Sequence, residues 1–407
     1  MKIKNHRSTG RHIGSIYPFG HDDTLTNFGT YIGDNVFGNP FVFDPFELYS
    51  NNVLTNPNIV VLGQIGRGKS ALIKSFIYRQ MALGRSAWII DPKGEYSSLC
   101  DALSIKPVIL KKHGGISINP LDDAENTIVN VILEARLKRP LNPIENTVID
   151  LVTRYLKESK IERVTLNDVS KLLLELKIEI VKDIHDDFDL LYQSTREIAY
   201  CLNLILTKEL SGVFDSTSSV SSKDIYSNSH PTVNVIDLSH FFNSTSLDIV
   251  MACTISWMQS YISNKSNNCN WFFVIDEAWA ILKNFATRQW LNRIWKLSRA
   301  YGVSNMAIFH RLSDLANGNF SDDVTKSEYS QIARGILSDS ETKIIFSQSS
   351  SELELLKATL HLNSTELSLL PKLPRAFALW KVGENSYLVR HLLSEFEQKF
   401  VFTDQNM

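Results

Sequence analysis

This sequence of 407 residues has few cysteines, no long apolar run and almost no net charge. No apolar stretch approaches the roughly 20 residues of a membrane-spanning helix, and the basic N-terminus lacks the apolar segment of a secretory signal. The formal net charge of −2 excludes a bulk polycation, so any contact with nucleic acid has to come from a local patch or from an assembly. The cysteines are too widely spaced for a disulfide framework or a paired metal site, which fits a reducing cytoplasm: Cys100, Cys201, Cys253 and Cys269.

A complete phosphate-loop pattern, G-x-x-x-x-G-K-[ST], occupies residues 63–70. An apolar run at 59–62 precedes it and an amphipathic run at 71–81 follows, which is the strand–loop–helix context that the motif needs. Glycines let backbone N–H groups converge on one point, at which the helix aims its partial positive charge. Lys69 can reach the β- and γ-phosphates of ATP and the Ser70 hydroxyl can ligate Mg²⁺. The alternative is a plain Gly-rich turn between strand and helix. The expected nucleotide-binding residues are Gly63, Gln64, Ile65, Gly66, Arg67, Gly68, Lys69, Ser70 and Ala71.

An acidic pair, Asp276-Glu277, follows the continuous apolar run 271–275, which is typical of a strand buried on both faces. In phosphate-loop enzymes a carboxylate at the end of a neighbouring strand holds Mg²⁺, and Asp276 fits this role together with Ser70. Glu277 would then stand beside the attacking water and polarise it, so that one carboxylate serves the metal and the other the proton. The alternative is an N-cap and a first-turn acid of a helix that starts near Ala278.

Apolar and β-branched runs alternate with helical patterns along most of the chain. Such alternation predicts an α/β fold with a mainly parallel sheet. Near the C-terminus, the runs 376–382 and 387–393 flank Gly383-Glu384-Asn385-Ser386 and predict a β-hairpin. The predicted strands lie at 59–62, 87–91, 107–110, 232–238, 271–275, 305–309 and 342–346, with short ones around 31–33 and 41–43.

Three parts are predicted along the chain. Residues 1–57 are rich in Gly, Asn, Asp, Pro and aromatic residues and form an irregular lead-in that packs on the core. Residues 58–124 and 230–407 form the ATPase core. Between them, residues 125–229 carry apolar side chains at helical spacing, which predicts an all-α insertion that ends in a Ser-rich return loop. Within the insertion, Thr165-Leu166-Asn167-Asp168 has the spacing of a capping box, with Asp in place of Glu or Gln.

Further strings behind the phosphate loop carry a family resemblance. Asp91-Pro92-Lys93-Gly94-Glu95-Tyr96 follows the second core strand, and Ile118-Asn119-Pro120-Leu121-Asp122 comes later. In this order they resemble the large HerA/FtsK-like ATPase of VirB-type systems, which serve type IV secretion and conjugation. Residues 14–19, 55–58, 310–315 and 378–383 are similar to the actinobacterial branch of that family. The resemblance runs from about residue 13 to the C-terminus, and it implies a RecA-like P-loop NTPase core in a minimal or shortened family member.

The resemblance also implies an assembly. Members form homo-oligomers, often hexameric rings, at the cytoplasmic face of the membrane, with nucleotide sites between subunits. A neighbour's arginine then stabilises charge on the γ-phosphate, which can be worth about 10³–10⁵ in rate. Arg299 fits this role, with Arg334 and Arg311 as further candidates; the alternative for Arg299 is a solvated helix charge. Other channel components, DNA and peripheral contact with a membrane complex are the implied partners.

One position departs from the family pattern. The family usually has a glutamine that senses the γ-phosphate at the end of the strand next to the Asp-Glu strand, and here the matching residue is His310. Imidazole can still donate a hydrogen bond, although its charge varies near neutral pH; a structural histidine is the alternative. Lys93 and Glu95 could face the nucleotide or a subunit boundary, or belong to a helix-start turn with Gly94 in a left-handed conformation.

Three functions follow from these patterns. The first is an ATP-hydrolysing motor of a type IV secretion or conjugation system, with Lys69, Glu277, Arg299 and His310 as catalytic residues. The second is a HerA- or FtsK-type DNA translocase that works without a secretion channel. The third is a nucleotide-gated scaffold that hydrolyses little ATP. A small-molecule kinase is disfavoured because residues 125–211 show no clustered polar groups.

Overall fold

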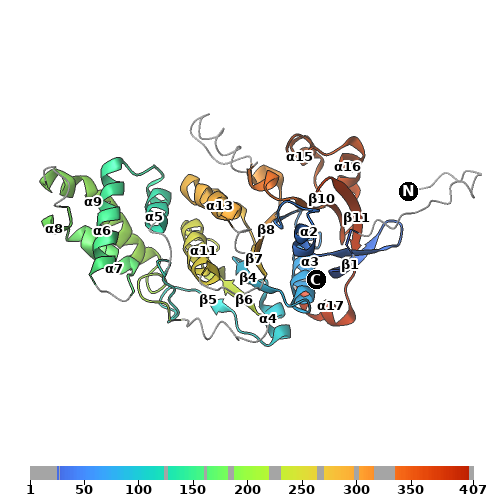
Figure 1. The fold of residues 1–407 in the computed structure, drawn as a ribbon, viewed down its shortest axis with the longest axis horizontal. Coiled ribbons are helices and arrows are strands. Elements are labelled where there is room, and N and C mark those ends of the chain that lie inside the picture. Colours follow the sequence, from blue (N-terminus) through green and yellow to red (C-terminus); the bar gives the residue numbers. More distant parts are fainter. Residues whose placement is uncertain are drawn as a thin grey trace, which may run out of the picture.

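The computed structural model describes residues 25–26, 28–122, 127–159, 163–181, 188–219, 231–263, 270–297, 302–315 and 335–402. Within these residues, eleven strands form one sheet in the order β2-β1-β11-β10-β9-β3-β8-β7-β4-β6-β5 (Figure 1). The strands are β1 (Thr30–Asn35), β2 (Pro40–Phe43), β3 (Ile59–Leu62), β4 (Ser86–Asp91), β5 (Val108–Ile109), β6 (Val233–Asp237), β7 (Trp271–Ile275), β8 (Val303–Phe309), β9 (Thr342–Phe346), β10 (Phe377–Val382) and β11 (Asn385–His391).

The sheet has a parallel and an antiparallel part. From β9 to β5 every neighbouring pair is parallel, whereas β10, β11, β1 and β2 continue the sheet antiparallel beyond β9. The predicted mainly parallel α/β sheet and the C-terminal hairpin are therefore confirmed. The hairpin turn is shorter than predicted, because Val382 already pairs with Asn385. Gly383 takes the positive φ, 56°, that such a two-residue turn requires.

All the predicted strands are present, and the bounds of the core strands differ by at most two residues from those expected. The largest difference is at β8, which begins at Val303 rather than at Asn305. The prediction was close because these strands are buried on both faces and read as continuous apolar runs. The lead-in is more regular than expected, since β1 and β2 both join the sheet.

Helices cover both faces of the sheet (Figure 1). Alternate residues of β3 explain the two layers: Ile59 and Val61 enter one apolar cluster, and Val60 and Leu62 enter the other. Helices α2 (Pro45–Ser50), α3 (Lys69–Met81), α4 (Ser97–Leu103) and α17 (Glu395–Val401) contribute to the first cluster, and α5 (Thr127–Leu137), α11 (Leu247–Ser263), α12 (Trp279–Leu282) and α13 (Phe285–Leu297) to the second. Helices α15 (Leu353–Leu360) and α16 (Ser364–Leu369) precede the hairpin.

A group of helices extends from one side of the core and forms one end of the molecule (Figure 1). The predicted capping box is confirmed: Thr165 accepts from the Asp168 backbone N–H, and the Asp168 carboxylate accepts from Thr165 N. The Ser-rich return loop, 216–229, is described only up to residue 219. Besides α5, the group contains α6 (Pro143–Glu158), α7 (Leu166–Leu174), α8 (Ile178–Val181), α9 (Phe188–Leu204) and a π-helical turn at Ile205–Glu209.

Asn119, from one of the strings that carry the family resemblance, connects the sheet to these helices. Its buried side chain donates to the Asp122 carboxylate and to the Val164 carbonyl, both at 2.9 Å. Its backbone N–H donates to Ser218 Oγ at 2.8 Å. A buried amide needs such partners, because a lost hydrogen bond would leave a desolvated polar group. The string therefore fixes the position at which the chain enters and leaves the helices.

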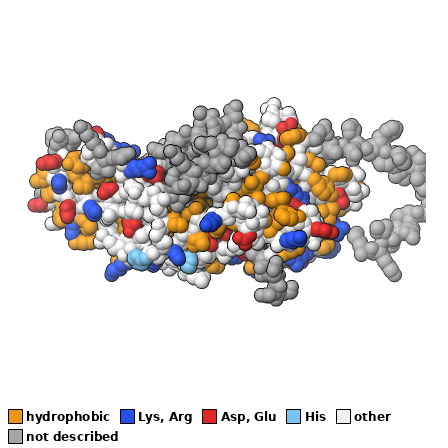
Figure 2. Space-filling view, turned by 90° about the horizontal axis from the view of Figure 1, so that it is seen from below, with side chains coloured by type: hydrophobic (Ala, Val, Ile, Leu, Met, Phe, Trp, Pro, Cys, Tyr) orange, Lys and Arg blue, Asp and Glu red, His pale blue; other side chains and the backbone are white. Residues whose placement is uncertain are grey.

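Charge is mixed on the surface. On the face shown in Figure 2, basic and acidic side chains are interspersed, in keeping with the formal net charge of −2. None of the helices in the described part of the chain combines the length and the hydropathy that a membrane crossing requires.

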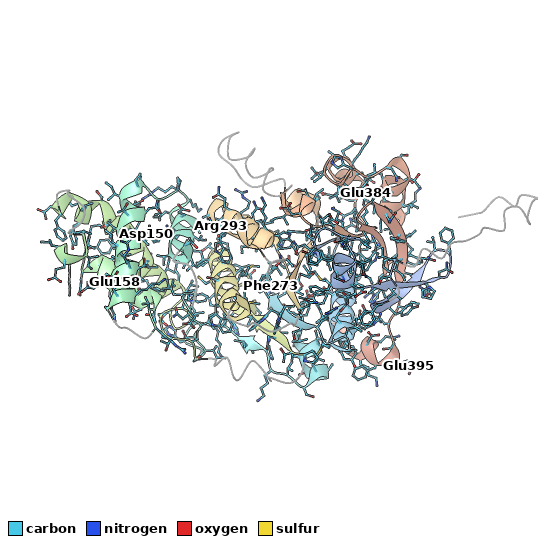
Figure 3. All side chains as sticks on the ribbon, in the orientation of Figure 1. Asp150, Glu158, Phe273, Arg293, Glu384 and Glu395 are labelled. Atoms are coloured by element: carbon cyan, nitrogen blue, oxygen red, sulfur yellow. The ribbon has the colours of Figure 1, made fainter. Side chains whose placement is uncertain are left out.

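An ion pair fixes the C-terminal helix to the helix of the phosphate loop. Arg79, in the last turn of α3, contacts both carboxylate oxygens of Glu397 at 2.6 and 2.7 Å and donates to the Leu392 carbonyl at 2.6 Å. Such bidentate pairs are among the stronger ionic contacts, because they add geometry to charge. In Figure 3, Glu395 at the start of α17 lies far from Asp150 and Glu158 of α6. The C-terminal helix α17 therefore lies on the same side of the molecule as α3 and the phosphate loop, away from α6.

Stability is expected to fall between pH 6.5 and about 4, in part through one buried histidine. His391 contacts Ser75 Oγ at 2.8 Å, and burial, together with the Arg79 charge, lowers its pKa from 6.5 to about 4. In that pH window the unfolded chain binds a proton that the folded chain does not, so stability rises with pH, by on the order of 3 kcal/mol in total. Urea unfolding as a function of pH should show a flatter profile in His391→Gln. The exposed His240→Gln should keep the wild-type slope, and an unchanged slope in both variants would contradict the assignment.

Candidate active site

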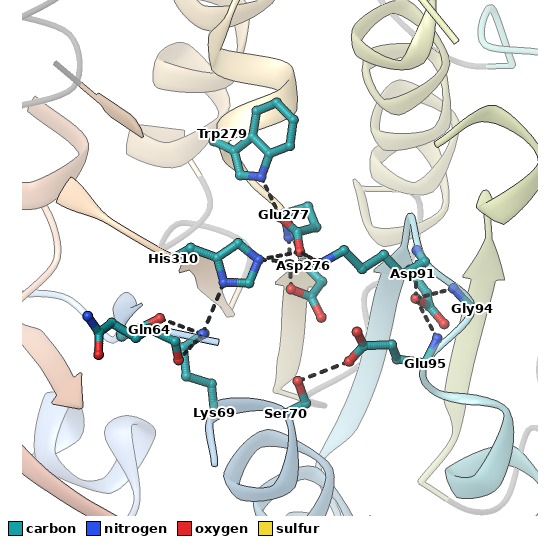
Figure 4. A network of polar contacts seen from close by, with 12 residues as sticks. Gln64, Lys69, Ser70, Asp91, Gly94, Glu95, Asp276, Glu277, Trp279 and His310 are labelled. Atoms are coloured by element: carbon teal, nitrogen blue, oxygen red, sulfur yellow. Dashed lines mark hydrogen bonds and ion pairs between the residues drawn. The ribbon is translucent and has the colours of Figure 1, made fainter. Parts of the chain in front are cut away.

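The strand order brings four loops to one edge of the sheet. β3, β8, β7 and β4 are consecutive and parallel, so their carboxyl ends lie side by side. The phosphate loop follows β3, His310 follows β8, Asp276 and Glu277 follow β7, and Asp91 ends β4. As expected, β8, the strand before His310, lies next to β7, the strand before Asp276 and Glu277. On its other side β8 lies next to β3, so it separates β3 from β7. His310 consequently lies between Lys69 and Glu277 (Figure 4).

The phosphate loop depends on its glycines. Gly66 and Gly68 have φ angles of 77° and 105°, which favour glycine. A Cβ on Gly63 would lie 2.5 Å from Phe346 Cβ, so that position has no room for a side chain. Gly68 is the N-cap of α3, and no side chain caps the first backbone N–H groups there. These donors and the partial positive end of the helix suit a bound phosphate.

Lys69 reaches across the loop. Its Nζ donates to the carbonyls of Gly63 and Gln64, at 2.5 and 3.0 Å, and lies 3.1 Å from His310 Nδ1. Burial lowers the pKa of Lys69 to about 8, although the neighbouring Asp276 and Glu277 charges oppose the shift. A triphosphate would bring more negative charge to this ammonium group and stabilise its charged form.

Asp276 and Ser70 provide hard oxygen ligands. Asp276 accepts from the Tyr96 hydroxyl at 3.2 Å and from the Glu277 N–H at 2.8 Å, while Ser70 Oγ donates to Glu95 at 3.1 Å. Burial, followed by the Glu277 and Glu95 charges, raises the pKa of Asp276 to about 7. Such an excess of buried negative charge beside a hydroxyl fits Mg²⁺, which prefers oxygen ligands and would stabilise the ionised carboxylate.

Glu277 has a left-handed backbone, with φ 50°. This conformation costs a residue other than glycine roughly 1–2 kcal/mol. It is held by the Glu277 N–H to Asp276 contact and by the Ala278 N–H, which donates to the Ile308 carbonyl at 3.1 Å. The alternative interpretation of the acidic pair as a helix N-cap is wrong, because α12 begins at Trp279 and Ala278 is its N-cap. The strain instead turns the carboxylate toward the end of β8 (Figure 4).

Three side chains contact the Glu277 carboxylate. His310 Nε2 lies 2.6 Å from Oε1, Lys93 Nζ forms an ion pair with the same oxygen, and Trp279 Nε1 donates to Oε2. With a proton on Nε2 the imidazole can donate to Glu277, while Nδ1 accepts from Lys69; Lys93 Nζ lies 3.4 Å from the same Nε2. Burial raises the pKa of Glu277, but the bonds from His310 and Lys93 outweigh it and hold the pKa at about 2.

The loop after β4 aims Lys93 and Glu95 at this site. Asp91 accepts four backbone N–H groups: those of Lys93, Gly94 and Glu95 on Oδ1, at 3.2, 2.8 and 3.1 Å, and that of Tyr96 on Oδ2, at 2.9 Å. Gly94 is left-handed, with φ 73°, as expected. The string is therefore a helix-start turn, as the second interpretation has it. Its Lys93 and Glu95 side chains contact Glu277 and Ser70, and whether they face a nucleotide or a subunit boundary stays a prediction.

Of the three candidate arginines, the described residues include Arg311 alone. Arg299 and Arg334 lie outside the described residues. Arg311 is exposed and borders a cleft of about 530 Å³ beside the phosphate loop, together with Arg375. The other lining residues are Gln64, Ile65, Gly66, Arg67 and His310. Which arginine acts on a neighbouring site therefore stays a prediction.

Sequence reasoning missed three residues near the site. Tyr96 ends the Asp91–Tyr96 string, and that string was a usable signal. Trp279 carries no motif; only its position two residues after Glu277 places its indole on the carboxylate. Arg375 is far away in the sequence and reaches the cleft through the sheet topology.

The fold and the site define a P-loop nucleoside triphosphatase with a RecA-like core. The family model described as "Helicase HerA, central domain" matches residues 45–255, which is half of the chain. The chain therefore belongs to the HerA helicase family, and the expected HerA/FtsK-like membership is confirmed. A search of the curated proteins found no significant match.

Solved structures show the same fold at low sequence identity. VirB4 of Thermoanaerobacter pseudethanolicus has a TM-score of 0.74 and 18% identity, over 93% of this chain and 100% of that chain. The unbound bacterial conjugative coupling protein TrwBΔN70 has a TM-score of 0.62 and 12% identity, over 91% and 90%. TrwB in complex with the non-hydrolysable ATP analogue ADPNP has a TM-score of 0.60 and 13% identity, over 91% of both chains.

Proposed function

We propose that this chain is an ATP-hydrolysing motor of a type IV secretion or conjugation system. The observation that carries the proposal is the convergence of Lys69, Asp276 and Glu277 after two parallel strands, β3 and β7, that flank β8, beside uncapped amides of α3. Membership of the HerA family supports it. So do the similar folds of VirB4 and of a conjugative coupling protein that has been crystallised with an ATP analogue and with ADP and Mg²⁺.

The chemistry follows from the positions of the side chains. Lys69 and the amides of residues 63–71 would hold the phosphates, and Ser70 and Asp276 would hold Mg²⁺, which would supply positive charge to the γ-phosphoryl oxygens. Glu277 accepts the proton of the attacking water. A carboxylate with a pKa of about 2 is a weak base. Glu277 therefore becomes a stronger base when Lys93 or His310 turns from it toward a phosphate oxygen.

The proposal extends to an assembly. A neighbour's arginine (Arg299, Arg334 or Arg311) would complete the site within a homo-oligomeric ring, and residues 125–229 would act as an inserted subdomain. Hydrolysis would release the γ-phosphate contacts and shift one subunit against the next, moving DNA or protein. Contact with channel components would take place peripherally at the cytoplasmic side of the membrane.

Turnover of MgATP as a function of protein concentration tests this function. If the arginine is supplied in trans, the specific activity should rise steeply as oligomers form, by up to the about 10³–10⁵ that such an arginine contributes. Analytical ultracentrifugation of the same samples would report the assembly. Negligible turnover in a fully assembled oligomer that binds ATP would contradict the motor and support a nucleotide-gated scaffold.

The HerA match also favours a second candidate, a DNA translocase that works without a secretion channel. Such a protein should show ATPase activity that DNA stimulates, and the stimulation should weaken steeply with salt because phosphate contacts release counterions. Activity that DNA leaves unchanged at any ionic strength would disfavour this candidate.

A further inference from the structure

We propose that Arg375 and Phe402 form the subsite for the base of the bound nucleotide, an inference that rests on the proposed function. The Arg375 guanidinium carbon lies 5.6 Å from the centroid of the Phe402 ring. Arg375 is exposed and Phe402 retains 39% of its surface, so both keep accessible area. A planar guanidinium group and an aromatic ring are the two side-chain types that stack on nucleobases.

The backbone next to Arg375 is fixed against the phosphate loop. The Ala376 N–H donates to the Arg67 carbonyl at 3.1 Å, and the Ala376 carbonyl accepts from the His391 N–H at 2.8 Å. Ala376 Cα lies 3.7 Å from the point that a Cβ on Gly68 would occupy. These contacts hold Ala376 in a left-handed conformation, with φ 69°, which a residue other than glycine adopts only when its surroundings impose it. Because these contacts fix the backbone at Ala376, Arg375 is held at the cleft that residues 64–67 of the loop also line.

Phe402 is placed by the end of α17. The carbonyl of the preceding residue, Val401, accepts from Lys74 Nζ at 3.5 Å. Lys74 is one turn after Ser70 on α3, and α17 packs against α3. Phe402 thus follows a residue fixed beside the first turns of α3, where a nucleotide held by Ser70 and Ala71 leaves the loop.

The position also fits the arrangement of the sheet. β9 and β10 lie on one side of β3, and β8 and β7 lie on the other. Glu277 and His310 act from the β7 and β8 side, whereas Arg375 and Ala376 immediately precede β10. A triphosphate with its γ end toward Glu277 therefore extends its nucleoside toward Arg375 and Phe402. Phosphate chemistry and base recognition would then occupy different ends of the cleft that His310 and Arg375 both line.

Calorimetric titration with two probes, ADPNP and inorganic tripolyphosphate, each with Mg²⁺, tests the subsite. Phe402→Leu and Arg375→Gln should each weaken ADPNP binding about tenfold, as expected for loss of a stacking partner, and leave tripolyphosphate binding unchanged. Phe402→Tyr should restore the affinity, because it keeps the ring. Unchanged tripolyphosphate binding also shows that the variants are folded.

Two substitutions serve as matched controls. Phe396 is exposed on α17, the helix that Phe402 follows, and Arg390 is exposed on β11. Phe396→Leu and Arg390→Gln should bind both probes as the wild type does. Equal loss for both probes in the Arg375 and Phe402 variants, or no loss for either, would overturn the subsite. A wild-type chain that binds ADPNP no more tightly than tripolyphosphate would also overturn it and leave the phosphate loop intact. A wild-type chain that binds neither would overturn the proposed function and the subsite together.

Discussion

Glu277→Gln should reduce ATP turnover by about 10²–10⁴, the usual contribution of a general base. The amide cannot accept the proton of the attacking water, but it has nearly the same shape as the carboxylate. Binding of MgATP should therefore be retained, since Lys69, Ser70 and the backbone amides of the loop are untouched. Steady-state hydrolysis and equilibrium binding of ATP, measured on the same assembled sample, would separate the two effects.

A matched control for this variant is Glu354→Gln, an exposed glutamate on α15. It should hydrolyse ATP as the wild type does. Turnover close to the wild-type rate in Glu277→Gln would remove Glu277 from the role of base. Loss of ATP binding in Glu277→Gln would instead indicate that its contacts with Lys93 and His310 keep the site in shape.

Lys69→Met should lower turnover by at least about 10²–10³, comparable to losing a preorganised donor to transition-state charge. Unlike Glu277→Gln, it should also weaken ATP binding, because Lys69 is a buried cation of the loop and is proposed to contact the phosphates. Methionine keeps most of the length of the side chain, so the fold should survive. Hydrolysis and ATP affinity should therefore fall together.

The exposed Lys372→Met provides the comparison for Lys69→Met. It removes the same charge from the chain and should change neither hydrolysis nor binding. If Lys69→Met bound MgATP as tightly as the wild type, the side chain would not contact the phosphates in the ground state. If Lys69→Met also hydrolysed ATP at the wild-type rate, Lys69 would have no role in catalysis.

Most of the sheet could be predicted from sequence, because its strands have a strong local signal. β3 and β7 read as continuous apolar runs, and their bounds match the expected ones. The phosphate loop could be predicted for a similar reason, since Gly66 and Gly68 provide the positive φ angles that the loop requires locally. The strands and the loop each depend on a short stretch of consecutive residues, so a single sequence is enough to predict them.

The order of the strands in the sheet could not be predicted in the same way. That β8 separates β3 from β7 is a long-range fact, and it decides that His310 joins Lys69 to Glu277. The left-handed conformation of Glu277 was also missed, because a glutamate gives no local reason to expect it. Trp279 and Arg375 reach the site only through such tertiary placement.

Within the described residues, the two outermost strands of the sheet limit how copies of this chain can join. β5 has two residues, and β2 has four and starts at a proline, which lacks a backbone donor. Short or proline-bearing borders are poor templates for hydrogen-bonding another chain. Neighbouring protomers are therefore expected to meet through side-chain surfaces, which can slide or rotate during a work cycle, rather than through a continuous β-ladder that would lock them together.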